Sequence, residues 1–311
     1  VMLVLSLAAC GGGKDAKDDS ADGDLSGKEI IIGNITPVTG AQAAYGLAIT
    51  NSIQMAIDEI NADGGILGAT VKLSTKDDQG TPAEAVSGFN SLLSEGAAAI
   101  IGATLSSCTS AITSLADDEG IVLVTPSSTA DSITTTDDYV FRSCFKDSFQ
   151  GEMVAAYAKD QGWTKAAILY ATGDTYSSGL HDSFVKAAEK YGIEIVCEQS
   201  SSDTGAVDFS SQLATIAASG ADMLFAPYYY DAVGPKIIPQ AREAGFKGAI
   251  MGCDGFDGTQ DYTTGDLSAY ENVYFTNHYS PEDSSEIVQS YVKNYTEKYG
   301  SESMNALGAL A

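Results

Sequence analysis

The sequence has few basic residues. It contains 16 lysines and arginines against 42 aspartates and glutamates among 311 residues, which gives a formal net charge of −26. The acidic residues are spread along the chain and form no long block of like charge. Because nucleic acids and anionic lipid surfaces attract basic proteins, this balance argues against both as partners and indicates a solvated acidic exterior.

The sequence also lacks the motifs on which many enzymes and metal sites depend. Histidine occurs only as His181 and His278, and we interpret both as ordinary surface or loop residues. The four cysteines that follow Cys10 show no C-x-x-C spacing, and we treat them as small core residues. There is no nucleophile elbow, phosphate-binding loop or zinc-protease motif, and the aspartates of loop 254–261 lack the spacing of a calcium loop. An enzyme is therefore disfavoured, and we expect neither a cofactor nor a metal.

Long apolar runs are absent after the first ten residues, VMLVLSLAAC. This opening ends in Leu7-Ala8-Ala9-Cys10, which is similar to a bacterial lipobox and is too short to span a bilayer. We interpret residues 1–10 as a signal-peptide remnant with lipid on Cys10, and residues 11–27 as a flexible acidic tether. The alternative is a plain secretory signal with an incidental cysteine. Both interpretations predict export, with the protein lipid-anchored at the outer face of the cytoplasmic membrane or periplasmic.

Strand and helix patterns alternate from residue 28 onward. Apolar strands are expected at 30–35 and 71–77, with an amphipathic helix after each. The second helix has Thr81 at its N-cap and Pro82 in its first turn, and it should end at Gly96. This alternation predicts an α/β protein with mainly parallel sheets and helices on both faces.

The alternation is interrupted once, at residues 137–150, and then restarts. We interpret this segment as a crossing between two similar doubly wound lobes. Residues 28–143 and about 279–311 are assigned to the first lobe, and residues 144–278 to the second. A cleft between two such lobes is a common location for a small-molecule site.

Two hydroxyl-rich loops follow neighbouring strands within residues 100–129. Ser106 lies just before an expected helix at 109–119, while Ser127 and Thr129 follow the next strand. Ligands bind at this edge of an open parallel sheet, so hydroxyls and helix N–H groups there suit a carboxylate. Ordinary helix capping and turn formation by serine and threonine is the alternative.

The second half offers a complementary charge. Asp254 directly follows an expected strand at 249–252 and can accept hydrogen bonds from an ammonium group. Tyr45, Tyr176 and Tyr229 are each expected in a loop after a strand, where they could form walls around a ligand. Core packing is the alternative for these tyrosines, because the chain contains 16 of them. Together with the hydroxyl-rich loops, this set fits a free amino acid.

Several motifs follow one another in a characteristic order along the chain. They are IGNITPVTGAQAAYG, AIDEINADGGILG, DDQGTPAEAV, IIGATLSS, VTPSST, YVFR with FQG, AILYATGDTYSSGL, DFSSQL, PQAREAGFKG and GCDGFDG. With them, residues 32–311 resemble the periplasmic leucine/isoleucine/valine-binding protein family, the type I solute-binding components of ABC transporters. The resemblance implies a monomer that captures a branched-chain or other small apolar amino acid and delivers it to a membrane permease and its ATPase. It also implies a further C-terminal part beyond Ala311.

The resemblance assigns roles to residues of the first lobe. Ser106 would hold the ligand carboxylate by its hydroxyl and N–H groups, and Thr129 would bind the same carboxylate. Ser127 would offer its backbone carbonyl to the ligand ammonium. Tyr45 would lie beside the pocket for the ligand side chain.

The resemblance also assigns roles in the second lobe. Tyr176 and Tyr229 would close over the ligand, and Asp254 would accept its ammonium group. Since one fold supports several outputs, a ligand-sensing ectodomain or regulator is the first alternative, and an enzyme is the second.

Overall fold

The structure, a computed structural model, describes residues 24–135, 138–263, 267–301 and 304–311. The predicted lipidation site Cys10 and most of the predicted tether lie outside these ranges. Within them, no helix combines the length and the apolar character needed to cross a bilayer.

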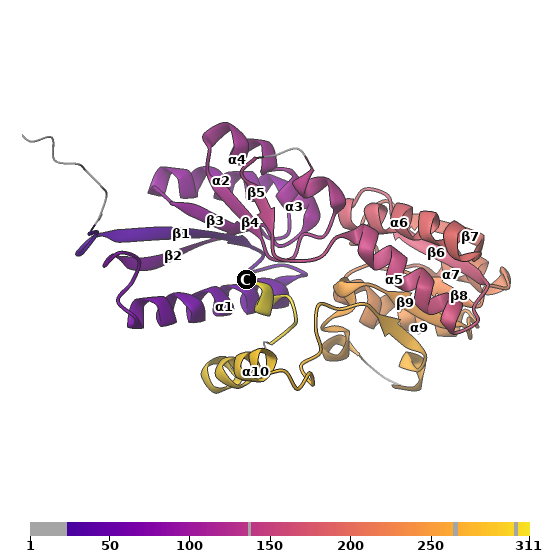
Figure 1. Ribbon diagram of the computed structural model, residues 1–311. Helices are drawn as coiled ribbons and strands as arrows, with labels where there is room; N and C mark the ends of the chain where they lie inside the picture. The colour runs from indigo at the N-terminus through magenta and orange to yellow at the C-terminus, as the bar shows by residue number, and fades with distance from the viewer. Residues whose placement is uncertain (1–23, 136–137, 264–266, 302–303) are drawn as a thin grey trace, which may run out of the picture.

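Two five-stranded sheets, parallel throughout, form the framework of the molecule (Figure 1). The first sheet has the order β2-β1-β3-β4-β5 and the second has the order β10-β9-β8-β6-β7. The strands are β1 (Glu29–Thr36), β2 (Thr70–Asp77), β3 (Ala99–Gly102), β4 (Val122–Thr125), β5 (Val140–Arg142), β6 (Lys165–Ala171), β7 (Glu194–Ser201), β8 (Met223–Phe225), β9 (Ala249–Gly252) and β10 (Val273–Phe275). The predicted α/β architecture with two similar lobes is confirmed.

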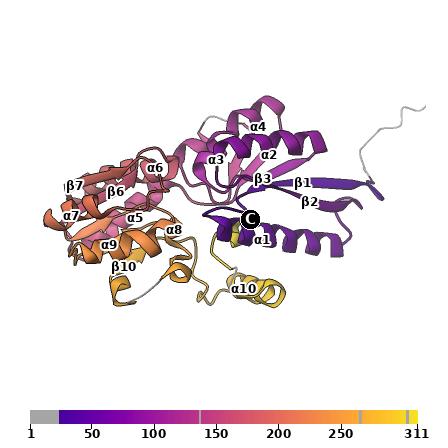
Figure 2. The same ribbon diagram turned by 180° about the vertical axis from the view of Figure 1, so that it is seen from behind.

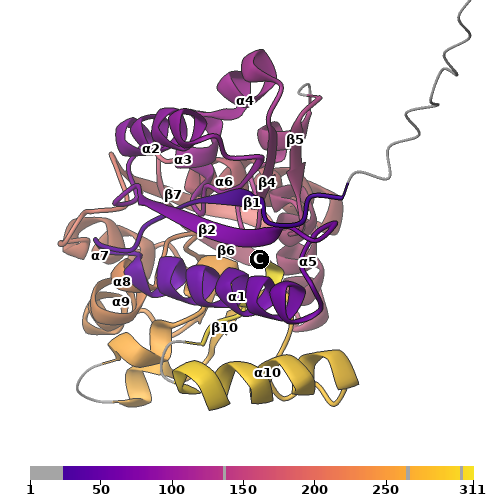
Figure 3. The same cartoon turned by 90° about the vertical axis from the view of Figure 1, so that its left-hand side faces the viewer.

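Helices flank both sheets, and we call each sheet with its helices a lobe. The first lobe carries α1 (Ala43–Ala62), α2 (Pro82–Glu95), α3 (Ser106–Ser110) and α4 (Thr113–Glu119). The second carries α5 (Asp147–Asp160), α6 (Thr175–Tyr191), α7 (Ser210–Ala218), α8 (Tyr230–Ala232) and α9 (Ile238–Glu243), with a π-helical turn at Val233–Ile237. The last helix, α10 (Glu286–Tyr299), lies beside α1 of the first lobe in both Figure 2 and Figure 3. Hydrogen bonds from Asn51 to Tyr295 and between Ser52 and Tyr291 join the two helices.

Local sequence signals account for α2. The Thr81 hydroxyl accepts a hydrogen bond from the Glu84 N–H at 3.4 Å, which satisfies one of the free donors of the first turn. Gly96 ends the helix in the left-handed conformation, with φ of 79°. Both ends therefore lie where the sequence predicts them.

The predicted helix 109–119 is wrong in its start and its continuity. The chain enters α3 at Ser106, turns at residues 111–112 and starts α4 at Thr113. The Thr109 hydroxyl donates to the carbonyl of Leu105 at 3.2 Å, and such local bonds bend helices. The turn also places Ile112 in the core, fully buried.

The predicted crossing at 137–150 is also corrected. Residues 140–142 form β5 at the edge of the first sheet, because Val140 is buried there and pairs with Leu123. The chain leaves the first lobe over residues 143–146, which we call the first crossing. It returns from β10 to α10 over residues 276–285, the second crossing.

Candidate functional site

Six of the seven residues predicted to bind a ligand line one cavity between the two lobes. They are Tyr45, Ser106, Ser127, Tyr176, Tyr229 and Asp254. Thr104, Leu105, Gly255 and Leu307 complete the lining. The seventh residue, Thr129, is fully buried but does not reach the cavity wall.

The cavity is almost filled by the side chains around it. Its volume is about 10 Å³, which is room for one water molecule at most. The rings of Tyr176 and Tyr229 stack with their centroids 4.9 Å apart and an interplanar angle of 17°. An amino acid therefore fits only when the lobes separate or these rings move.

Tyr45 bridges the two lobes. Its hydroxyl lies 2.8 Å from the carbonyl oxygen of Gly255 and 3.0 Å from that of Asp257. Tyr45 was expected in a loop, but it lies in the first turns of α1. The helix passes close to the preceding loop at Gly46, where a Cβ atom would lie 2.0 Å from the carbonyl oxygen of Pro37. This close approach directs the neighbouring tyrosine toward the second lobe.

Tyr176 was also expected in a loop, but it lies in the first turn of α6. Asp174 accepts a hydrogen bond from the Ser177 N–H at 2.8 Å and so starts the helix before Tyr176 instead of after it. Tyr229 does follow its strand in a loop, directly before α8.

The first lobe supplies hydroxyl groups. The Ser106 hydroxyl accepts from the Ala130 N–H at 3.2 Å, and the Ser127 hydroxyl donates to the Thr104 carbonyl at 2.8 Å. Ser127 therefore uses its hydroxyl proton within the lobe. These contacts tie the two hydroxyl-rich loops together at the carboxyl ends of β3 and β4.

Two buried hydroxyls at the site are not satisfied by the protein. Tyr229 has no hydrogen-bond partner for its hydroxyl among the described residues. The Thr129 hydroxyl likewise meets no partner at hydrogen-bond geometry in the described chain, although it lies near enough to Asp147 to lower the pKa of that carboxyl. An unsatisfied buried hydroxyl costs about 1–3 kcal/mol, which a polar ligand could offset.

Asp254 is held from three directions in the second lobe. Its Oδ1 atom accepts hydrogen bonds from Gln150 at 2.8 Å and from Tyr176 at 3.0 Å. Its Oδ2 atom lies 3.4 Å from Nε2 of His278. The side chain is only 4% exposed, so this carboxylate occupies a largely dry setting in which a cationic partner is favoured.

His278 lies in an irregular segment, as the sequence indicates, but its side chain is buried and not at the surface. Its side chain is 3% exposed, and its ring stacks on Phe145 with a centroid distance of 3.9 Å. These two aromatic residues belong to different crossings, so the sequence gives no sign that they meet. His181 differs, because its imidazole bonds to Asp182 and Glu198, stacks on Tyr170 and does not line the cavity.

Gln150 and Asp147 were also missed. Gln150 belongs to the FQG motif, which gave a signal of resemblance but no role. Its side-chain amide donates to Asp254 and, at 3.3 Å, to Asp147. Burial raises the pKa of Asp147 well above its usual value, and the nearby charge of Asp254 adds to the effect. Asp147 looked like an ordinary acidic residue at a helix start.

The site shows no sign of metal or redox chemistry in the part of the chain that the structure describes. No group of three or more histidine, cysteine or acidic side chains there is arranged to hold a metal ion. Cys108, Cys144, Cys197 and Cys253 are all free. Burial raises the pKa of Cys144 to about 12, so its thiol stays protonated and unreactive at neutral pH.

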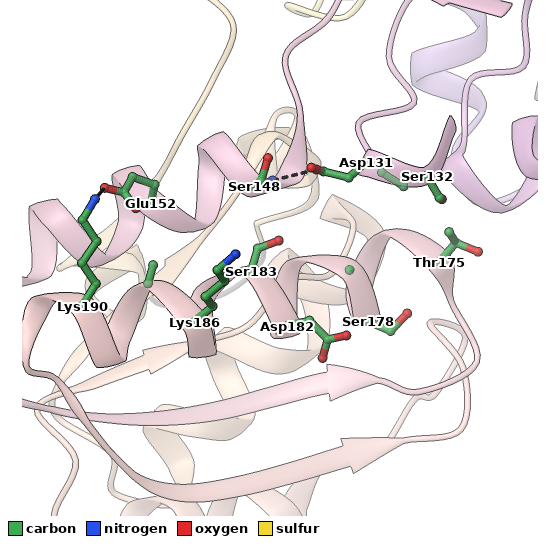
Figure 4. A pocket seen from close by; sticks show the side chains of 13 residues that line it. Asp131, Ser132, Ser148, Glu152, Thr175, Ser178, Asp182, Ser183, Lys186 and Lys190 are labelled. Atoms are coloured by element: carbon green, nitrogen blue, oxygen red, sulfur yellow. Dashed lines mark hydrogen bonds and ion pairs between the residues drawn. The ribbon is translucent and has the colours of Figure 1, made fainter. Parts of the chain in front are cut away.

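A second, larger hollow of about 720 Å³ lies along α5 and α6 (Figure 4). Its wall carries serines and charges of both signs, and none of the predicted site residues is among them. Glu152 and Lys190 form an ion pair there, and the Ser148 N–H donates to Asp131 at 2.9 Å. This hollow is open to solvent and contains none of the predicted site residues, so we take the smaller, buried cavity as the candidate site.

The sequence matches the periplasmic binding protein family over residues 29–311. It is 31% identical over 251 residues to Leu/Ile/Val-binding protein homolog 3 of Brucella melitensis, covering 80% of this chain and 67% of the relative. It is 31% identical over 254 residues to Leu/Ile/Val-binding protein BraC3 of Rhizobium johnstonii, covering 81% and 68%.

Solved structures agree with these relatives. The leucine-binding protein LivK of Thermotoga maritima superposes with a TM-score of 0.83 and 31% identity, covering 90% of this chain and 79% of that one. LivJ of Streptococcus pneumoniae, in complex with isoleucine, gives a TM-score of 0.81 and 31% identity, covering 91% and 80%.

Proposed function

Because this chain belongs to the periplasmic binding protein family, among relatives of the Leu/Ile/Val-binding type, we propose that it binds a free amino acid between its lobes. A branched-chain or other small apolar amino acid fits best. The protein then delivers its ligand to the permease and ATPase of an ABC importer. No catalytic group is required for this activity.

The observation that carries the proposal is the polarity of the cavity. Asp254 supplies a buried negative charge from the second lobe, and Ser106 supplies a hydroxyl from the first. An amino acid carries its ammonium group and its carboxylate on the same carbon atom, so the two groups can contact one lobe each. Asp254 takes the ammonium in this arrangement, with the Ser127 carbonyl beside it.

The carboxylate and the side chain have their own surfaces. Ser106 binds the carboxylate at the cavity wall. Thr129, which lies behind the wall, would join it once the lobes separate, and this contact would satisfy its buried hydroxyl. Leu105 and Leu307 form apolar walls that suit an aliphatic side chain. Tyr45 lies next to that side chain.

Closure follows from the two crossings. We assign residues 28–143 and 279–311 to one lobe and 144–278 to the other, with hinge motion between them. Tyr176 and Tyr229 cover the ligand as the lobes meet. Lipid on Cys10 and an acidic tether would keep the protein near its permease at the outer face of the membrane.

A thermal-shift screen over the amino acids tests the proposal. A ligand present at a hundred times its Kd should stabilise the folded protein by about 2.7 kcal/mol. We expect leucine, isoleucine or valine to raise the melting temperature, with glucose and adenosine as controls that do not. If no amino acid shifts the transition while another class of solute does, the proposal is wrong.

A further inference from the structure

His278 occupies a place where the hinge and the binding site meet. It lies in the second crossing, and its ring stacks on Phe145 of the first crossing. On its other side, Nε2 faces Oδ2 of Asp254 at 3.4 Å. A single imidazole therefore contacts both segments that join the lobes and the acid proposed to bind the ligand.

The geometry leaves this contact incomplete. The hydrogen bonds from Gln150 and Tyr176 both end on Oδ1 of Asp254, so His278 alone approaches Oδ2 from the crossing. At 3.4 Å the imidazole nitrogen makes no hydrogen bond to any described residue. Oδ2 of Asp254 can therefore form an ion pair either with His278 or with a cation that enters the cavity.

Most other titratable groups around Asp254 are acidic or neutral. From the helices and strands that pack around it come Asp147 of α5, Tyr176 of α6, Tyr229 before α8, and Cys253 and Asp257 of the loop that holds Asp254. The crossings contribute Cys144 and Tyr279, and burial raises the pKa of each to about 12. Arg142 lies near Cys144, but its guanidinium bonds to the carbonyls of Ser128 and Ala130. Of these groups, His278 is the one that both touches Asp254 and can gain a positive charge.

We propose that His278 is a positioning residue whose protonated form competes with the ligand ammonium group for Asp254. This inference rests on the proposed function. Histidine is the side chain whose ordinary titration falls between pH 5 and 8. Below this range the imidazolium pairs with Asp254 and repels the ammonium group, so binding weakens. Above it the neutral ring leaves Asp254 to the ligand, and at intermediate pH ligand binding releases a proton.

The ion pair can be tested without any ligand. The chain has only two histidines, so their imidazole signals can be followed by NMR from pH 5 to 9 and assigned with the variant His278→Gln. Asp254→Asn removes the facing charge, so the imidazole signals of His278 should change at lower pH than in the parent. His181 should be unaffected and is the internal control. Unchanged titration of His278 in Asp254→Asn would refute the pairing.

Competition is tested by calorimetry with L-leucine between pH 5.5 and 8, in two buffers of different ionisation enthalpy. The parent should bind about tenfold more weakly at the acidic end than at pH 8, because the imidazolium then occupies Asp254. It should also release a proton on binding at intermediate pH. His278→Gln, and His278→Phe, which keeps a ring to stack on Phe145, should lose both effects, while His181→Gln keeps them.

The outcomes separate the two proposals. Leucine binding with the same pH dependence in the parent and the His278 variants refutes competition but leaves the binding function standing. If the parent binds no amino acid at pH 8, both the binding function and the competition are refuted. The NMR titration still shows whether His278 pairs with Asp254. Should both His278 variants fail to fold, the titration in Asp254→Asn decides.

Discussion

The hydroxyl of Tyr45 and the carbonyl of Gly255 meet at 2.8 Å, although the residues belong to opposite lobes. Tyr45 comes from α1 below the first sheet, and Gly255 follows β9 of the second. This contact joins the two lobes, so it stabilises the arrangement in which they lie together. Both residues line the cavity, so under the proposed hinge motion the contact would form as the ligand is enclosed.

Tyr45→Phe should therefore loosen closure without unfolding the protein. Loss of one hydrogen bond of about 0.5–1.5 kcal/mol predicts a rise of roughly twofold to tenfold in the Kd for L-leucine. Small-angle scattering should show a larger radius of gyration in the ligand-free variant. Tyr139→Phe, at an exposed tyrosine of the first lobe, is the matched control and should change neither measurement. An unaltered Kd in Tyr45→Phe would show that this bond does not hold the closed form.

Asp254→Asn should abolish most of the affinity for an amino acid. Breaking a buried charge pair costs about 2–5 kcal/mol, which corresponds to a rise in Kd of roughly thirtyfold or more. The fold should persist, because asparagine can still accept from Gln150 and Tyr176. Asp261→Asn, on the exposed part of the same loop, is the control for calorimetry and circular dichroism. Parent-like binding by Asp254→Asn would mean that another group takes the ammonium.

Gly255→Ala should damage the site from within. The added Cβ would lie 2.7 Å from the hydroxyl of Tyr176 and 2.8 Å from the carbonyl oxygen of Tyr228, so the Tyr176 ring must move away from Asp254. We expect at least a tenfold loss of affinity in calorimetry, in line with a displaced charge-assisted hydrogen bond of about 1.5–3 kcal/mol.

Gly179→Ala is the matched control for that substitution. Its Cβ would lie 3.4 Å from Asp147, which is an ordinary contact. Replacing glycine by alanine inside a helix stabilises the fold by about 0.5–1 kcal/mol. Its affinity should stay at the parent value and its melting temperature should rise. Equal affinities in both alanine variants would exclude the proposed role of the Tyr176 ring.

Asp77 and Asp78 should respond to pH with opposite signs. Burial raises the pKa of Asp78 from 3.8 to about 6, even though the Gly80 N–H donates to it. Its unfolded form loses the proton first, so this group makes the unfolding free energy fall as pH rises from about 4 to 6. Asp78→Asn should remove that slope and stabilise the protein at pH 7 by on the order of 2 kcal/mol.

The neighbouring Asp77 provides the contrast. Burial by itself would raise its pKa, but hydrogen bonds from Thr39, Gln79 and Val38 outweigh burial and lower it. The stabilisation that ionised Asp77 gives to the folded protein is present at neutral pH. It is lost as pH falls below about 4, the pKa of this group in the unfolded chain. Asp77→Asn should destabilise the protein at pH 7. Urea denaturation at pH 4, 5, 6 and 7 gives the free energy of unfolding of both variants. If both substitutions change this free energy in the same direction at pH 7, the opposite pKa shifts of Asp77 and Asp78 are contradicted.

The sequence by itself determined the local elements and their order. Alternating strand and helix periods, the capping of α2 by Thr81 and Gly96, and the hydroxyl-rich loops after β3 and β4 are all written in short stretches. The signals for them lie in residues a few positions apart, so pattern alone predicts them. Motif resemblance then brought six of the residues that line the cavity to attention.

The tertiary structure decided which of these groups touch. Gln150 and Asp254 are 104 positions apart, and Tyr45 and Gly255 are 210 apart, so their bonds depend on the packing of two lobes and not on local pattern. The same packing buried His278 beside Asp254, set Thr129 behind the cavity wall and filled the cavity with aromatic rings. Such contacts depend on how the two crossings hold one lobe against the other, and no short stretch of sequence encodes that arrangement.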